Sequence, residues 1–175
     1  HDIFTVAEAN GVTPADLPQW VGKDGAFSML FEFSHLELSY PKGEIWCKRF
    51  PWKLGQLKDA LSASQAATAK EGWYPIFFEN HDQNRSMHRY FPEGTDPKAA
   101  AKALATVLFT LRGTPFVYEG EEIGMTNTAF PKIEDYNDIS THGQYEYAIK
   151  EGLSPEEALK AVQFQSRDNA RTPMQ

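Results

Sequence analysis

The 175-residue sequence has a single cysteine and no long hydrophobic run. Cys47 has no second cysteine for an internal disulfide, and its neighbours do not give the spacing of a metal site. A stretch of about 18 apolar residues, the minimum for a transmembrane helix, is absent from the sequence. We therefore expect no metal, no cofactor and no membrane partner, and a cytoplasmic location is compatible with the lone thiol.

Positive charge is also scarce, with 17 Lys and Arg against 24 Asp and Glu and a formal net charge of -7. Such a surface has no bulk attraction for phosphate backbones, so a nucleic-acid partner is not expected. Hydrophobic residues make up 41% of the chain and charged residues 23%, which is typical of a globular protein and excludes disorder.

Short apolar runs alternate with stretches of helical periodicity. The sequence predicts strands at 3–7, 27–31, 74–78 and 116–118 and helices around 54–61, 96–111 and from Ser154 onward. Asp96 and Pro97 suit a helix start, whereas Arg112 to Pro115 suit its end. Ser154 and Glu157 have the spacing of a capping box. The region from 119 to 152 is predicted to be a long polar stretch.

This order of strands and helices favours parallel strands joined by crossover helices, hence an α/β layered or barrel fold. A (βα)8 barrel needs about 250 residues, so four strands in 175 residues amount to roughly half of one. In such folds ligands bind where the strands end at their carboxyl side. Glu8 follows the first predicted strand, and His81 and Asp82 follow the third. Paired carboxylates at one barrel mouth would suit cleavage of a glycosidic bond, although each acid alone is as readily a helix cap or a solvated residue.

Four stretches of the sequence resemble the α-amylase superfamily, and more narrowly its α-glucosidase and oligo-1,6-glucosidase branch. They are TVAEANGV (5–12), FFENHDQNRS (77–86), RGTPFVYEGEEIGMTN (112–127) and SRDNARTPMQ (166–175). The resemblance implies that residues 1–175 are a partial catalytic barrel domain, truncated at both ends. It would hold strands 5 to 8 of a (βα)8 TIM barrel with their helices and the long loop after strand 8.

The resemblance also implies roles for individual residues. Glu8 matches the general acid/base, and Asp82 matches the carboxylate that stabilises the transition state. His81 and Arg167 match residues that bind the sugar, whereas Arg171 is expected to be structural. The implied substrates are short oligosaccharides with α-1,6 or α-1,4 linkages, hydrolysed with retention of configuration.

The family nucleophile and its metal-binding loop are expected upstream of His1. The isolated segment is therefore predicted to be inactive, because a retaining mechanism needs that carboxylate. Unpaired strand edges lead us to expect self-association of the segment. The sequence also departs from the family pattern at Ala7, where glycine is usual, and at Asn84, where proline is common.

Three alternatives remain open. A trehalose-6-phosphate hydrolase has a similar ending, an inactive amylase-like interaction domain has a similar fold, and a sugar-binding module would need no nucleophile. Three other histidines, His35, His88 and His142, are expected to have surface or packing roles. The acidic run after the fourth strand is expected to be a solvated or hydrogen-bonded loop that shapes the barrel mouth, with no catalytic role: Glu119, Glu121 and Glu122.

Overall fold

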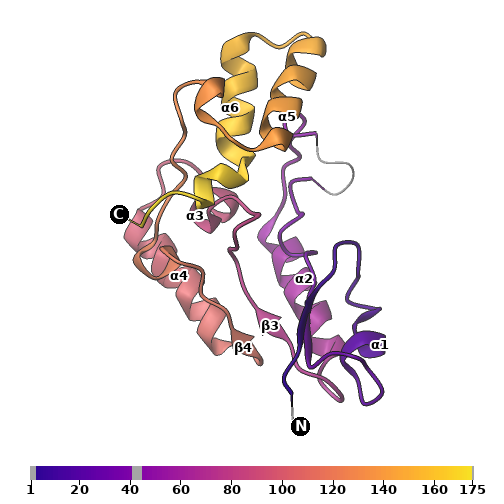
Figure 1. Cartoon of the computed structure of the whole chain (residues 1–175). Helices are drawn as coiled ribbons and strands as arrows, with labels where there is room; N and C mark the ends of the chain where they lie inside the picture. The colour runs from indigo at the N-terminus through magenta and orange to yellow at the C-terminus, as the bar shows by residue number, and fades with distance from the viewer. Residues whose placement is uncertain (1–2, 41–44, 175) are drawn as a thin grey trace. The chain divides into compact units, whose positions relative to one another are not determined.

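The computed structural model describes residues 3–40 and 45–174, and Figure 1 labels their helices and strands. The chain divides into two compact units. The first consists of His1–Pro41, Phe50–Phe77 and Val107–Phe116, and the second of Lys42–Arg49, Phe78–Thr106 and Val117–Gln175.

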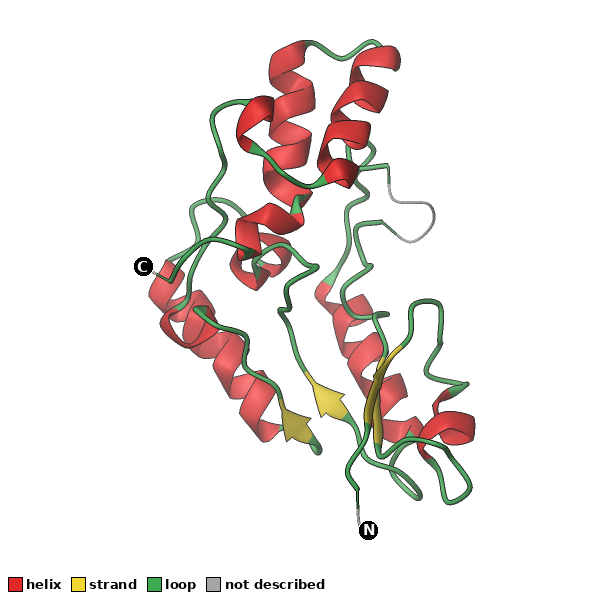
Figure 2. Cartoon of the chain, in the orientation of Figure 1, coloured by secondary structure: helices red, strands yellow, loops and turns green. Residues whose placement is uncertain are grey.

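Unit 1 contains two pairs of parallel strands (Figure 2). Strand β1 (Val6–Glu8) pairs with β2 (Met29–Phe31), and β3 (Pro75–Ile76) pairs with β4 (Thr114–Pro115). Parallel neighbours require crossover connections. Helix α1 (Leu17–Val21) lies in the connection from β1 to β2, two helices lie between β3 and β4, and α2 (Leu54–Ala67) lies between the two strand pairs in sequence. The predicted alternation of parallel strands and helices is therefore confirmed.

Aromatic rings fill the core of unit 1 between the two strand pairs. The ring of Phe31 lies edge-on to those of Phe77 and Phe116, with centroids 4.7 and 4.8 Å away. Residues 74–78 are buried throughout, as expected for a strand covered on both faces. These contacts connect the strand ends through side chains, since β2 and β3 are not paired by backbone hydrogen bonds.

The strand boundaries differ from those predicted. Strand β1 begins at Val6 and includes Glu8, and β4 covers 114–115 where 116–118 was expected. The amides of Thr114 and Phe116 donate to the carbonyl oxygens of Tyr74 and Ile76 at 2.9 and 2.8 Å. Because alternate residues of a strand face the same neighbour, the nitrogen of Pro115 faces away from β3, and proline is tolerated inside the strand.

A buried carboxylate links β2 to the elements around it in unit 1. Glu32 accepts hydrogen bonds from the Ser64 hydroxyl at 2.6 Å, the Tyr74 hydroxyl at 2.7 Å and the Ser34 amide at 2.9 Å. Burial alone would raise the pKa of Glu32, but His35, whose Nδ1 lies 3.8 Å away, and the hydrogen bonds from Ser34 and Ser64 lower it to about 2. The carboxylate of Glu32 is therefore charged in the folded protein, and its hydrogen bonds connect the end of β2 to α2 and to the residue before β3.

Unit 2 is mainly helical. Its α-helices are α3 (Ser86–Tyr90), most of α4 (Pro97–Thr110), α5 (Ile139–Lys150) and α6 (Pro155–Gln165), with short 3-10 turns η1 (Glu121–Ile123), η2 (Ile133–Asp135) and η3 (Arg167–Ala170). The predicted caps are present. Asp96 accepts from the Lys98 amide at 3.2 Å, and Ser154 and Glu157 form the reciprocal capping box.

The apolar side chains of α4 are not all buried: Leu104 and Leu108 are buried, whereas Val107 is 36% exposed. Helix α5 falls inside the long polar stretch predicted at 119–152, where no helix was expected. It was missed because only Thr141 and Ala148 are buried on it, and α5 is stabilised mainly by lying beside α6 (Figure 1).

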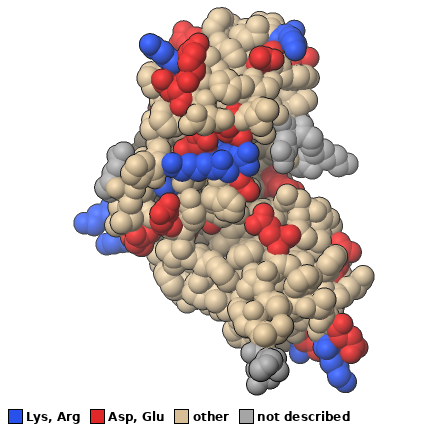
Figure 3. Space-filling model, in the orientation of Figure 1, with Lys and Arg blue, Asp and Glu red and all other residues tan. Residues whose placement is uncertain are grey.

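Acidic and basic side chains are interspersed on the face drawn in Figure 3, which shows no broad basic surface. Among the helices of residues 3–40 and 45–174, none combines the length and the apolar character needed to span a bilayer.

Candidate active site

Two of the predicted site residues of unit 2, His81 and Asp82, lie on the loop between β3 and α3. The loop runs from Asn80 to Asn84. The Asp82 amide donates to the Asn80 side-chain oxygen at 2.9 Å, which is a local turn made by an asparagine. The backbone of Asp82 is thereby fixed within the loop itself.

The carboxylate of Asp82 is bound by two arginines from η3 and the residue that follows it. Its Oδ1 accepts from Arg167 Nη1 at 2.8 Å and from Arg171 Nη2 at 2.7 Å. His81 Nε2 lies 3.4 Å from the other oxygen, Oδ2. The structure thus brings together three of the four predicted site residues, and the two arginines make charge-assisted bonds to the same oxygen.

Arg167 is also hydrogen-bonded to Asp138, the N-terminal cap of α5. Its Nε donates to Asp138 Oδ1 at 2.8 Å, and Asp138 Oδ2 accepts from the amide and hydroxyl of Thr141 at the start of α5. Burial disfavours the charge of Arg167, but the hydrogen bonds to Asp138 and Asp82 outweigh it and raise the pKa of the guanidinium. Arg167 therefore stays charged and oriented toward Asp82.

The cluster is open on its outer side. The side chains of Asp82 and Arg167 are each 34% exposed and that of His81 is 61% exposed. Such a group offers a carboxylate acceptor, guanidinium donors and an imidazole within reach of a ligand. Vicinal hydroxyl groups, which both donate and accept, match this combination.

Glu8, the fourth predicted site residue, lies in unit 1. It is the last residue of β1, opposite Phe31 of β2, and its side chain is exposed. The prediction placed it after the strand, and the structure places it at the strand's carboxyl end. This is the position at which parallel β/α folds carry functional groups.

Two residues of the cluster were not predicted as part of the site. Arg171 was expected to be structural, and its Nε does donate to the His81 carbonyl oxygen at 2.8 Å, but its Nη2 also binds Asp82. Asp138 was not considered at all. The spacing from Asp138 to Thr141 is a recognisable helix start and would have found both α5 and this carboxylate.

The ring nitrogens of the other three histidines contact backbone atoms outside the cluster around Asp82. His35 Nε2 lies 2.8 Å from the Phe77 carbonyl oxygen, His88 Nδ1 accepts from the Asn127 amide, and His142 Nε2 lies 2.8 Å from the Tyr136 carbonyl oxygen. Among the residues that the structure describes, no three His, Cys, Asp or Glu side chains gather closely enough to hold a metal ion.

Glu121, in the acidic run after β4, is partly buried, and the charges of Glu79, Arg85 and Arg89 act on it. Its Oε2 accepts from the Tyr118 amide at 3.0 Å, but its Oε1 is buried without a hydrogen-bond partner. Burial raises the pKa of Glu121 to about 7, and the nearby carboxylate of Glu79 adds to the effect. The folded protein therefore holds a proton on Glu121 more tightly than the unfolded chain does.

We expect this proton to make stability depend on pH. The contribution is complete below about pH 4.5, the ordinary value for Glu, and is lost as the pH rises to about 7. Glu121→Gln should flatten this slope and stabilise the protein above pH 7 by up to about 3 kcal/mol. Urea unfolding from pH 4.5 to 8 measures it, with Glu122→Gln as an exposed control; parallel curves for wild type and Glu121→Gln would contradict the expectation.

The parallel strands with intervening helices, and a carboxylate–arginine cluster on the loop that follows β3, define the chain as a segment of an α/β protein. A family model for the alpha amylase catalytic domain matches residues 1–175. The chain belongs to this family, and its fold is that of a fragment of a TIM barrel.

Individual relatives agree with the family. The chain is 41% identical over 177 residues to an oligo-1,6-glucosidase of Parageobacillus thermoglucosidasius, a match that covers 100% of this chain and 31% of the relative. Among solved structures, isomaltulose synthase from Klebsiella sp. LX3 matches with a TM-score of 0.88 and 33% identity, covering 100% of this chain and 32% of that chain. Trehalose-6-phosphate hydrolase from Bacillus licheniformis matches with a TM-score of 0.87 and 38% identity, over 97% and 31%. The chain thus spans about a third of the length of the relatives it matches.

Proposed function

We propose that this chain is the part of a retaining α-glucosidase barrel from the fifth to the eighth strand. The observation that carries the proposal is the carboxylate of Asp82, held by Arg167 and Arg171 on a loop after a parallel strand and open on its outer side. In a family of carbohydrate enzymes, such a group suits the hydroxyls of a bound glucosyl ring. The substrates would be short α-1,6 or α-1,4 linked glucosides.

In this proposal each site residue has a defined role. Glu8 donates a proton to the departing glycosidic oxygen and later removes a proton from the attacking water. Asp82 stabilises the positive charge that develops at the anomeric carbon, while His81 and Arg167 bind the sugar hydroxyls. No residue of this chain is assigned as the nucleophile.

A second candidate is hydrolysis of trehalose-6-phosphate. It is favoured by the trehalose-6-phosphate hydrolase match, whose sequence identity of 38% approaches the 41% of the oligo-1,6-glucosidase. The two candidates share the glucosyl site and differ in what the other side of the cleaved bond must accommodate. A phosphate would need a cationic group there, whereas a second glucose would not.

The deciding experiment is a substrate panel on the full-length enzyme. We expect cleavage of isomaltose or maltose, with α-glucose appearing first in the proton NMR spectrum because the configuration is retained. Faster cleavage of trehalose-6-phosphate would favour the second candidate. Conversion of sucrose to an isomer would indicate a synthase, and no turnover of any of these sugars would contradict the proposed function.

A further inference from the structure

The loop that carries His81 and Asp82 is closed at its base by a buried ion pair. Glu79 precedes the loop and Arg85 follows it, and Arg85 Nη1 lies 2.9 Å from Glu79 Oε2. Both side chains are almost completely buried, at 3% and 0% exposure. The five residues between them therefore begin and end at fixed points.

The carboxylate of Glu79 also fixes the start of α3. Its Oε1 accepts from the amide and the hydroxyl of Ser86 at 2.8 and 2.6 Å. One carboxylate thus binds both residues at the far end of the loop, the guanidinium of Arg85 and the backbone of Ser86. A buried charge with this many donors is held in one orientation.

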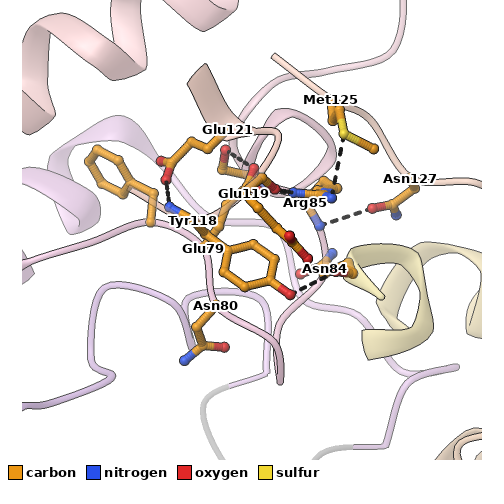
Figure 4. A network of polar contacts seen from close by, with 12 residues as sticks. Glu79, Asn80, Asn84, Arg85, Tyr118, Glu119, Glu121, Met125 and Asn127 are labelled. Carbon is orange, nitrogen blue, oxygen red and sulfur yellow. Dashed lines mark hydrogen bonds and ion pairs between the residues drawn. The ribbon is translucent and has the colours of Figure 1, made fainter. Parts of the chain in front are cut away.

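Arg85 connects the loop to the segment after β4 (Figure 4). Its Nη1 also donates to the Glu119 carbonyl oxygen at 2.8 Å, and its backbone amide donates to Asn127 Oδ1 at 3.0 Å. Gly120 makes the close approach feasible. Its φ is +86°, and a Cβ there would lie 2.2 Å from the Met125 sulfur and 3.3 Å from Arg85 Nη1.

A second arginine ties the same loop from the α3 side. Arg89 Nη1 donates to the Phe78 carbonyl oxygen and its Nη2 to the Asn84 carbonyl oxygen, both at 2.8 Å. The Asn84 side chain in turn donates to the Phe164 carbonyl oxygen at 2.9 Å. The loop ends are thus held by directional polar contacts from several segments of unit 2.

We propose that Glu79 and Arg85 are positioning residues that set where the Asp82 carboxylate stands; the proposal rests on the function assigned above to Asp82. Neither side chain is hydrogen-bonded to Asp82, so Glu79 and Arg85 influence the position of its carboxylate through the backbone of the loop. A well-packed apolar pair could fill the same buried space, but it would not fix both loop ends by direction. A transition-state contact is sensitive to such placement, since a displacement of about 1 Å can cost about 100-fold in rate.

The test compares two variants of the full-length enzyme with wild type. Arg85→Met alone would leave Glu79 buried without its cation, so the first variant is Glu79→Gln/Arg85→Met, which removes both charges and keeps an acceptor for Ser86. Ala148→Gly, in α5 of the same unit, is the control for a general loss of stability. We expect the double variant to melt near the control, yet to lose about 10- to 100-fold in kcat on 4-nitrophenyl α-glucoside with little change in KM.

Hydrogen exchange supplies a readout that does not depend on activity. In the double variant the peptide over residues 79–86 should exchange faster than in wild type, while α5 and α6 should be unchanged. In Ala148→Gly the pattern should be the reverse.

Wild-type exchange over 79–86 in the double variant overturns the proposal, whether or not the enzyme is a glucosidase. A wild-type kcat in the double variant overturns it as well, provided that Asp82→Asn is impaired. If the wild-type enzyme turns over no α-glucoside, the proposed function fails, and the exchange experiment still decides whether this ion pair holds the loop.

Discussion

Replacing Glu8 by Gln in the full-length enzyme is expected to lower kcat on isomaltose by about 100-fold or more, since general acid/base catalysis contributes at least that much. The loss should be smaller on 4-nitrophenyl α-glucoside, because nitrophenolate departs without a proton. Azide needs no general base, so it should accelerate turnover of the aryl glucoside by the variant and not by wild type. Steady-state kinetics on both substrates, with and without azide, measure the effect.

The control for this prediction is Glu122→Gln. It makes the same change in charge at an exposed residue of η1 and should leave both substrates unaffected. If Glu8→Gln cleaved isomaltose at the wild-type rate, the general acid/base would be another residue.

Asp82→Asn is expected to lower kcat/KM by about 100- to 1,000-fold, the usual range for losing an electrostatic contact to the transition state. The amide keeps the shape of the carboxylate but removes the charge that faces Arg167 and Arg171. Unlike the loss at Glu8, this loss should be similar for isomaltose and the aryl glucoside, because charge develops at the anomeric carbon with either leaving group.

Asp59→Asn, an exposed residue in the middle of α2, is the matched control and should behave as wild type. The comparison separates the two acids by leaving-group dependence as well as by size of effect. An Asp82→Asn enzyme that is impaired on isomaltose alone would indicate a role in proton transfer and contradict the stabilising role.

The predictability of each element depended on how far away its partners lie in the sequence. Helix α6 was predicted from its start because Ser154 and Glu157 cap it within three residues. Strand β4 was misplaced because its bounds depend on hydrogen bonds to residues about 40 positions earlier. Helix α5 buries only Thr141 and Ala148, so its sequence shows no clear apolar periodicity. Its stability depends on packing against other elements, which the sequence alone does not reveal.

The site followed the same rule. Asp82 and Arg167 are 85 residues apart, and no local pattern relates them, so only the resemblance to a family could pair them. Arg171 and Asp138 complete the cluster through contacts that depend on the fold. Glu79 and Arg85 are only six positions apart in the sequence, but no local pattern indicates that both side chains are buried.

The proline inside β4 gives the two edges of that strand different properties. Toward β3 the strand donates through Thr114 and Phe116. On the opposite edge position 115 can accept a hydrogen bond through its carbonyl oxygen but has no amide hydrogen to donate. A strand that pairs with this edge therefore lacks one hydrogen bond of the ladder, and it pairs best in a register in which its carbonyl oxygens do not face Pro115. The proline therefore disfavours non-specific pairing of this edge of β4 with a strand of another chain, and restricts the registers in which a strand can pair with it.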